Sequence, residues 1–226
     1  MCGRFNIIDD PFTRLIVEMT GQVYSGGTRY NIAPTEQIPV LTKVDIAAWS
    51  LREMRWWLVP YWAKEPTTKY TMFNAKSETL TKSSAFREPF KRRRCIIPAS
   101  GYYEWKKEGS VKIPFYIEPE NEYGFSFAGL WDRWQKDDQV IESCTIVTAA
   151  APESMRAVHS RIPVHLTREQ VNAWVDADTS PDELNKLLAP EIRFPLTVTP
   201  VSTYVNNARN KDDRCVEPLG EPVRIH

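Results

Sequence analysis

Short apolar stretches of the kind found in β-strands follow one another along most of this chain. Most of them are bounded by Gly, Pro, Asp or Asn, the residues that end strands and form turns. The pattern predicts strands over residues 38–42, 46–58, 94–98, 102–107, 114–117, 125–131, 141–149 and 194–200. We therefore expect a chain built mainly of short strands that tight turns connect.

Helical spacing of apolar residues is confined to three segments. Residues 10–21 begin with Asp-Pro, carry apolar side chains at helical intervals and end in glycine, which predicts a short capped helix. A second helix is expected over 167–175 with Thr167 as N-cap, and a third over 180–188 with Ser180 as N-cap. In the third helix, a proline at the first position and a glutamate three residues after the cap strengthen the start signal.

Together these elements predict one α+β domain over residues 1–226. Its core is expected to be an antiparallel sheet or barrel-like structure, with a few short helices at the periphery. Eight Trp and 17 Pro residues favour a rigid, strand-rich body over a helical bundle. No repeat, low-complexity segment or long linker interrupts the chain, and the residues after 200 are expected to form a polar tail.

The chain carries no net charge, since 29 Lys and Arg residues balance 29 Asp and Glu residues. This balance argues against bulk coating of nucleic acid, although it permits a local basic groove. Its four cysteines show no CxxC spacing, and neither a signal peptide nor a long apolar segment is evident. We expect a reduced, cytoplasmic protein with free thiols and no membrane association.

Cys2 has unusual chemistry because of its position. A small residue after the initiator methionine generally allows Met1 to be removed, which gives Cys2 a free α-amine beside its thiol. The ordinary pKa values of these groups are roughly 7.7–8.0 and about 8.5, so both are partly deprotonated near neutral pH. The amine can form a Schiff base with an aldehyde, and the thiol can then close a five-membered thiazolidine. The alternative is an early cysteine that belongs to the core.

Three further polar residues are candidates for catalysis. Glu104 lies in an aromatic strand, where an inward carboxylate has a raised pKa suited to proton transfer and an outward one is an ordinary surface group. His159, just before Arg161, is either a proton-transfer group or a structural loop residue. Asn74 either contacts substrate or forms a turn. His165 is expected to be structural, and no metal or other cofactor is predicted, because no ligand spacing is present.

Two sequence clusters have both a structural and a nucleic-acid interpretation. The basic run 91–94, with Arg87, is either a solvated face or part of a phosphate path. Aromatic residues crowd the region from 49 to 62. Most are expected to be core residues, but an exposed pair could stack on bases, and Trp56 and Trp57 are the candidates.

Six ordered motifs make the chain resemble the SOS response-associated peptidase (SRAP) family of abasic-site processing proteins. They are MCGRF at 1–5, RYNIAP at 29–34, NAKSET at 74–79, PASGYYEW at 98–105, VTAA at 147–150 and HSRIP at 159–163. Each motif is weak alone, but six in order are specific, and together they span nearly the whole chain.

The resemblance implies a compact β-rich fold with an electropositive groove for single-stranded DNA. It implies that mature Cys2 captures the aldehyde of an abasic site as a thiazolidine, with Asn74, Glu104 and His159 as the other active-site residues. Glu104 would protonate the departing sugar oxygen, His159 would assist proton transfer, and Asn74 would orient the amine. Removal of Met1, by the protein itself or by an aminopeptidase, would precede capture.

The resemblance also implies phosphate contacts by Arg4 and Arg161. Lys76 stands where relatives usually carry arginine, which keeps the charge but loses the bidentate geometry of a guanidinium. Trp57 stands where relatives tend to have glycine. The expected partner is single-stranded DNA with abasic sites, bound by a monomer that associates with the nucleoid when on DNA.

Three other functions remain open on the sequence. One is an N-terminal cysteine amidohydrolase of the glutamine amidotransferase type, which also begins Met-Cys-Gly. Another is a thiol peptidase that uses Cys2, His159 and Glu104, in its most defensible form cleaving its own N-terminus. The third is a module that binds damaged single strands by stacking and charge, without covalent chemistry.

Overall fold

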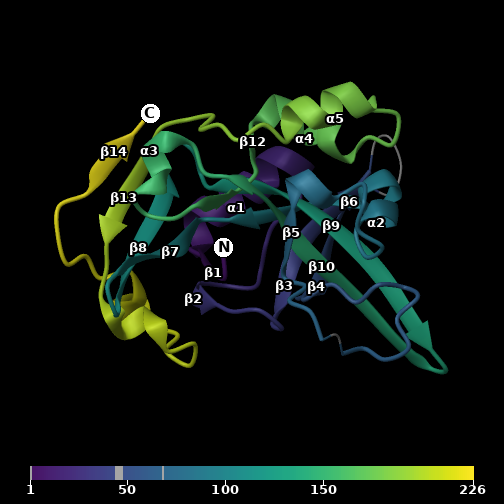
Figure 1. Cartoon of the computed structure of the whole chain (residues 1–226), viewed down its shortest axis with the longest axis horizontal. Coiled ribbons are helices and arrows are strands. Elements are labelled where there is room, and N and C mark those ends of the chain that lie inside the picture. The colour runs from purple at the N-terminus through teal and green to yellow at the C-terminus, as the bar shows by residue number, and fades with distance from the viewer. Residues whose placement is uncertain (1, 44–47, 68) are drawn as a thin grey trace.

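Two β-sheets and a set of short helices form the protein in this computed structural model, which describes residues 2–43, 48–67 and 69–226 (Figure 1). The described strands are β1 Arg4–Ile7, β2 Arg29–Ile32, β3 Gln37–Lys43, β4 Trp49–Trp56, β5 Asn74–Lys76, β6 Arg94–Ala99, β7 Gly101–Glu108, β8 Val111–Pro119, β9 Phe125–Lys136, β10 Gln139–Ala150, β11 Arg161–Pro163, β12 His165–Leu166, β13 Leu196–Pro200 and β14 Val223–Ile225. The α-helices are α1 Asp9–Thr20, α2 Arg87–Arg92, α3 Glu153–Arg156, α4 Arg168–Val175 and α5 Pro181–Leu187. Short 3-10 turns over Ser77–Thr79 (η1), Thr203–Asn206 (η2) and Asp213–Val216 (η3) complete the described elements.

The six-stranded sheet is antiparallel throughout, in the order β14-β13-β8-β7-β1-β2. The eight-stranded sheet follows β11-β10-β4-β3-β6-β9-β12, and β9 also pairs with β10. This extra pairing closes a barrel of β10, β4, β3, β6 and β9. Within it, β4 and the short β5 both run parallel to β10. The expected α+β fold with a barrel-like β core and small peripheral helices is confirmed.

The helix caps that the sequence indicates are present. The backbone N–H of Thr167 donates to Gln170 Oε1 at 3.0 Å before α4, and the N–H of Glu183 donates to Ser180 Oγ at 3.2 Å in α5. Helix α1 begins without a side-chain cap and ends at Gly21, whose φ of 71° is the left-handed conformation that glycine adopts most easily.

The longer strands lie where the apolar pattern predicts them, but the shorter ones do not follow from it. Strands β9 and β10 extend beyond the predicted ranges into a long hairpin that projects from the body (Figure 1). In the predicted strand 46–58, positions 46 and 47 lie outside the described residues. The sequence pattern missed β1, β2, β5, β11, β12 and β14, each of only two to four residues.

A continuous hydrophobic core joins the two sheets. Phe5 of β1 packs on Trp56 of β4 with ring centroids 5.1 Å apart, and Tyr102 of β7 packs on Phe127 of β9 at 5.7 Å. These contacts hold β1 and its neighbour β7 against the barrel. Cys2 lies two residues before the start of β1. Among the described helices, none combines the length and the apolar character needed to cross a membrane.

The residues after 200, expected to form a polar tail, pack against β2. Asn31 Nδ2 lies within 3.2 Å of the carbonyl oxygens of Val205 and Asn207, and Lys211 Nζ lies 2.6 Å from the carbonyl oxygen of Asn31. The Asn31 side chain of β2 binds backbone carbonyl groups of this segment, and Lys211 binds the Asn31 carbonyl in return, a placement that the polar composition did not indicate. The segment thereby forms one side of the site described next.

Candidate active site

Cys2 lies at the seam between the two sheets, directly before β1. Its side chain is fully buried, and Sγ lies 3.8 Å from the carbonyl oxygen of Arg4. Asn74, at the start of β5, donates from Nδ2 to the carbonyl oxygen of Cys2 at 2.7 Å. Because β5 pairs with β10, this hydrogen bond ties Cys2 to the barrel. Burial raises the pKa of the Cys2 thiol, so its neutral form dominates near pH 7.

Glu104 faces inward from β7 and is 1% exposed. Alternation along the strand places it on the same face as the buried Tyr102. Desolvation raises the pKa of Glu104 to about 7. Of the two orientations that the sequence allows, the inward one is therefore correct, and the carboxyl is divided between its protonated and ionised forms near neutral pH.

His159 lies beside this carboxyl, with Nδ1 3.9 Å from Glu104 Oε2. The same ring nitrogen lies 3.0 Å from the backbone N–H of Arg161 and 3.1 Å from its carbonyl oxygen, so the backbone of Arg161 holds the ring in place. Burial also lowers the pKa of His159. The imidazole therefore lies next to the Glu104 carboxyl as a mainly neutral ring near pH 7.

The two arginines expected to contact phosphates are both held in place by protein groups. Arg161 makes a bidentate ion pair with Glu78, at 2.6 and 3.0 Å, and also contacts Thr148 Oγ1 at 3.2 Å. Arg4 Nη1 donates to Asn31 Oδ1 and to the carbonyl oxygen of Val205, both at 3.0 Å. Both guanidinium groups are fixed by these protein contacts, and Arg161 already has an anionic partner.

The aromatic candidates separate into core and surface residues. Trp56 is fully buried and its Nε1 donates to the carbonyl oxygen of Phe73 at 2.9 Å, so it has no face for a base, and its predicted DNA contact was wrong. Trp57 is half-buried, 5.7 Å from the Phe73 ring. The exposed aromatic side chains of this region are instead Tyr61 and Trp62, at 54% and 52%. Sequence alternation alone could not separate these neighbours.

Lys76, at the end of β5, is exposed.

A cavity of about 480 Å³ opens over Glu104 and His159, a volume within the range of small-ligand sites. Its lining residues are Gly3, Arg4, Glu104, Trp105, Lys107, Lys112, His159 and Asn206. Trp105, Lys107, Lys112 and Asn206 were missed as site residues by the sequence analysis. The placement of Lys107 and Lys112 on either side of a short Gly-containing turn was the available signal, since such positions become cross-strand neighbours in a hairpin.

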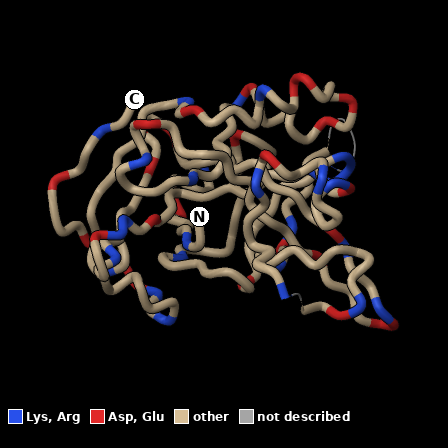
Figure 2. The backbone as a smooth tube through the Cα atoms, in the orientation of Figure 1, with Lys and Arg blue, Asp and Glu red and all other residues tan. Residues whose placement is uncertain are grey.

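The basic run 91–94 does not form a continuous phosphate path. Arg93 Nε lies 3.2 Å from an Asp132 carboxylate oxygen, and Arg94 is buried against backbone carbonyls. Figure 2 shows Lys and Arg interspersed with Asp and Glu along much of the tube. Only part of this run is therefore available to an external anion.

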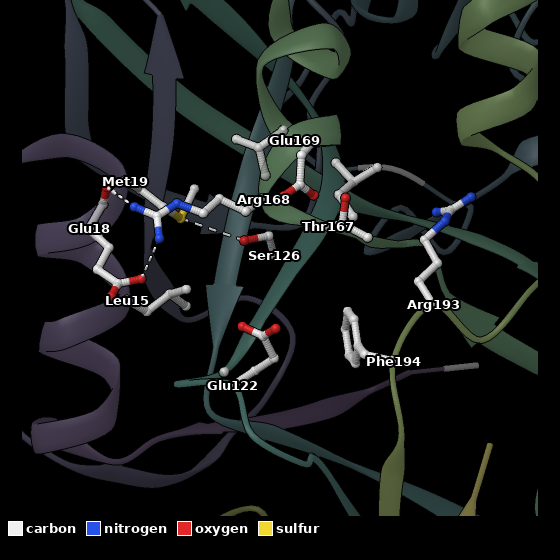
Figure 3. A pocket seen from close by; sticks show the side chains of 13 residues that line it. Leu15, Glu18, Met19, Glu122, Ser126, Thr167, Arg168, Glu169, Arg193 and Phe194 are labelled. Carbon is white, nitrogen blue, oxygen red and sulfur yellow. Dashed lines mark hydrogen bonds and ion pairs between the residues drawn. The ribbon is translucent and has the colours of Figure 1, made fainter.

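A second cavity, of about 310 Å³, lies between α1, α4 and Phe194 (Figure 3). An ion pair between Arg168 and Glu18, with 3.2 Å between their nearest atoms, crosses it. It contains none of the candidate site residues. In the described ranges, no group of three or more His, Cys, Asp or Glu residues is arranged to hold a metal ion.

Comparisons with known proteins point to one family. The chain matches the family described as "SOS response associated peptidase (SRAP)" over residues 1–208. It is 35% identical over 223 residues to Abasic site processing protein YoqW of Bacillus subtilis (strain 168), covering 96% of this chain and 99% of that one. It is 31% identical over 231 residues to Abasic site processing protein HMCES of Gallus gallus, covering 87% and 68% respectively.

A crystal structure of a protein from Bacteroides thetaiotaomicron superimposes with a TM-score of 0.83 at 25% identity, covering 96% of this chain and all of that one. The motifs, the fold and the near-complete overlap with these relatives agree with one another. The chain belongs to the SOS response associated peptidase (SRAP) family.

Proposed function

We propose that this protein captures the aldehyde of an abasic site in single-stranded DNA as a covalent thiazolidine on the mature N-terminal Cys2. The observation that carries the proposal is that Cys2, which Asn74 holds, lies close enough to Glu104 for their charges to interact, while Glu104 and His159 line a cavity whose rim is cationic. Family membership and the names of the relatives, abasic site processing proteins, support the same substrate.

Capture requires two bond-forming steps. The α-amine of Cys2, free once Met1 is absent, adds to C1′ of the ring-opened deoxyribose, and loss of water gives an imine. The Sγ–H then adds across the C=N bond, so that sulfur bonds to C1′ and the proton passes to nitrogen. The product is protein plus DNA minus one water. An internal cysteine cannot react this way, because its nitrogen belongs to a peptide bond.

Glu104 is suited to both proton transfers. Near its pKa of about 7, protonated molecules can donate to the sugar oxygen as the ring opens, and ionised molecules can accept a proton from the attacking amine. His159 lies 3.9 Å from the carboxyl and can carry protons between it and the cavity. Asn74 holds the Cys2 carbonyl and so orients the residue that reacts.

Contacts with the DNA backbone are proposed for Arg4, Lys76 and Arg161, which are cations around this site. Tyr61 and Trp62 provide exposed rings on which bases can stack. Because Arg161 is paired with Glu78, a phosphate that takes its place must compete with a carboxylate. Bound to DNA in this way, the protein would be found with the nucleoid in the cytoplasm.

Intact mass spectrometry of the protein mixed with a single strand bearing one abasic site tests the proposal. The expected new species has the mass of protein lacking Met1 plus DNA minus one water. It should be absent with the undamaged strand and with Cys2→Ala. An equal yield of adduct from Cys2→Ala would contradict capture by the N-terminus.

A thiol peptidase acting on its own N-terminus is the second candidate, because the same Cys2, Glu104 and His159 group adjoins the Met1–Cys2 bond. The two activities are compatible, since cleavage would create the amine that capture needs. A variant with a short extension before Cys2 should lose that extension during expression, and Glu104→Gln should retain it. Retention of the extension by the otherwise unaltered protein would exclude this activity.

A further inference from the structure

Two lysines face each other across the hairpin at one edge of the cavity. Lys107 of β7 and Lys112 of β8 are directly paired in the antiparallel ladder, and both are exposed. Like charges in this position repel each other. The pair lowers the stability of the hairpin unless an anion lies between or above the two ammonium groups.

No such anion comes from the protein itself. Among the described residues, neither Lys107 nor Lys112 lies within 4.0 Å of a carboxylate. Glu108, the carboxylate next to the hairpin turn, is used elsewhere, since it pairs with Lys106 at 2.6 Å. The hairpin therefore carries one neutralised lysine and two lysines without a protein counter-charge.

Both lysines line the cavity that contains Glu104 and His159. On the same side, Trp105 lies under the Arg4 guanidinium at 5.9 Å and donates from Nε1 to Asn206 Oδ1 at 2.6 Å. Figure 1 shows the β7–β8 hairpin beside the C-terminal segment, to which Asn206 belongs. A strand whose sugar reaches Glu104 must leave the cavity along one of its walls, and this wall is cationic.

We propose that Lys107 and Lys112 together bind one backbone phosphate of the DNA strand next to the captured nucleotide. This inference rests on the proposed function, because it takes single-stranded DNA as the ligand. Directly opposed side chains of a ladder start about 5 Å apart, so two flexible ammonium groups can reach a single phosphate. The site adds a contact on the hairpin wall, away from Lys76 and Arg161.

The test is the salt dependence of binding to a fluorescein-labelled, undamaged 15-nucleotide strand, measured by anisotropy between 50 and 300 mM NaCl. Each phosphate contact contributes a slope of about −0.7 to log Kobs against log[salt] for single strands. Because the two lysines share one phosphate, the double variant Lys107→Ala/Lys112→Ala should lose about 0.7 of the slope. Replacement of both by arginine should preserve it.

Lys106→Ala is the matched control, since it removes one charge from the same strand but from the lysine that Glu108 already neutralises. Its slope should equal that of the unsubstituted protein. Thermal unfolding of each variant separates loss of contact from loss of fold. The double variant should be no less stable than the parent, because it removes the repulsion between the two exposed lysines.

The outcomes separate this inference from the proposed function. A double variant with an unchanged slope, in a protein that forms the abasic-site adduct, overturns the phosphate site and leaves capture intact. A reduced slope in a protein that forms no adduct supports the phosphate site and overturns capture. Equal losses in Lys106→Ala and the double variant would show only a general charge effect, and would overturn the assignment to this pair.

Discussion

At the scale of single residues, the site owes its chemistry to burial more than to local charge. Cys2 and Glu104 are both removed from water, and desolvation raises the pKa of each. The thiol of Cys2 therefore stays protonated near pH 7, and the carboxyl of Glu104, which would ordinarily be ionised, is partly protonated there. His159, also partly buried, stays neutral and adds no fixed positive charge.

Glu104→Gln should lower the rate of abasic-site capture at pH 7 by roughly 10²-fold, the usual scale for loss of a general acid–base group. The rate of the parent divided by that of the variant should fall as pH rises through about 7, because the protonated carboxyl of the parent is then lost. Single-turnover rates between pH 5.5 and 8.5 give this ratio. Ionisation of the Cys2 α-amine affects parent and variant alike, so it cancels from the ratio. A ratio that does not vary with pH would assign Glu104 a purely structural role.

Asn74→Ala should slow capture by roughly 10-fold to 100-fold, because the reacting residue loses the hydrogen bond that orients it. The buried carbonyl of Cys2 loses a partner, which should cost about 1–3 kcal/mol of stability. Capture rates at saturating DNA and urea unfolding measure the two effects separately. Unaltered capture in a destabilised variant would mean that the bond serves the fold alone.

At the scale of elements, short segments from distant parts of the chain supply the functional groups. Arg161 at the start of β11 and Glu78 in η1 are joined by their ion pair over the end of β10. Within the described part of the chain, Arg94, at the start of β6, pairs with no carboxylate in this way. Its guanidinium instead donates to carbonyl oxygens in the last turns of α2 and α4. Its Nη1 donates to the carbonyl oxygen of Phe90 at 2.6 Å, and its Nε to that of Trp174 at 2.5 Å.

Arg94→Met should destabilise the protein by about 3 kcal/mol, since it leaves the last carbonyls of α2 and α4 without their buried donor. Arg92→Ala, an exposed neighbour in the same basic run, should change stability by less than about 0.5 kcal/mol. Urea denaturation of both variants checks the difference. Similar midpoints for the two would show that the carbonyl contacts of Arg94 contribute little.

At the scale of the whole molecule, the joining of two sheets creates both the site and a liability to acid. His165 lies in the common core, 1% exposed, against the rings of Phe125 and Phe194, and neither ring nitrogen has a hydrogen-bond partner among the described residues. Burial, with a smaller contribution from the charge of Arg193, lowers the pKa of His165 to about 3. The histidine is therefore neutral whenever the protein is folded near neutral pH.

Stability should consequently fall as pH decreases below about 6.5, where the unfolded chain binds a proton at this position and the folded protein does not. Between pH 7 and 4.5 the loss due to His165 is about 3 kcal/mol. Glu104 acts in the opposite direction, since its raised pKa makes the folded state bind a proton more readily. His165→Leu isolates the histidine: the difference in unfolding free energy between parent and variant should shift by about 3 kcal/mol over this range, and a constant difference would contradict the assignment.

Local sequence determined the features that depend on near neighbours. The caps at Thr167 and Ser180 and the turn-bounded apolar runs specify helices and long strands, because a hydrogen bond within four residues or a period of two is set by adjacent side chains. The six ordered motifs likewise indicated the family before any contact was known. The candidate residues Cys2, Asn74, Glu104 and His159 came from those motifs and lie together in the structure.

Only the tertiary structure decided which of several similar residues serves the site. Trp56 is core while Trp62 is exposed, Arg94 binds carbonyls, and Lys107 and Lys112 face the cavity. The short strands β1 and β5 were equally beyond the sequence pattern. The physical reason is that burial and charge pairing depend on partners far away in the chain, as with Asn74 and the Cys2 carbonyl, 72 residues apart. Folding selects those partners by joining the two sheets, and no window of local sequence contains both sides of such a contact.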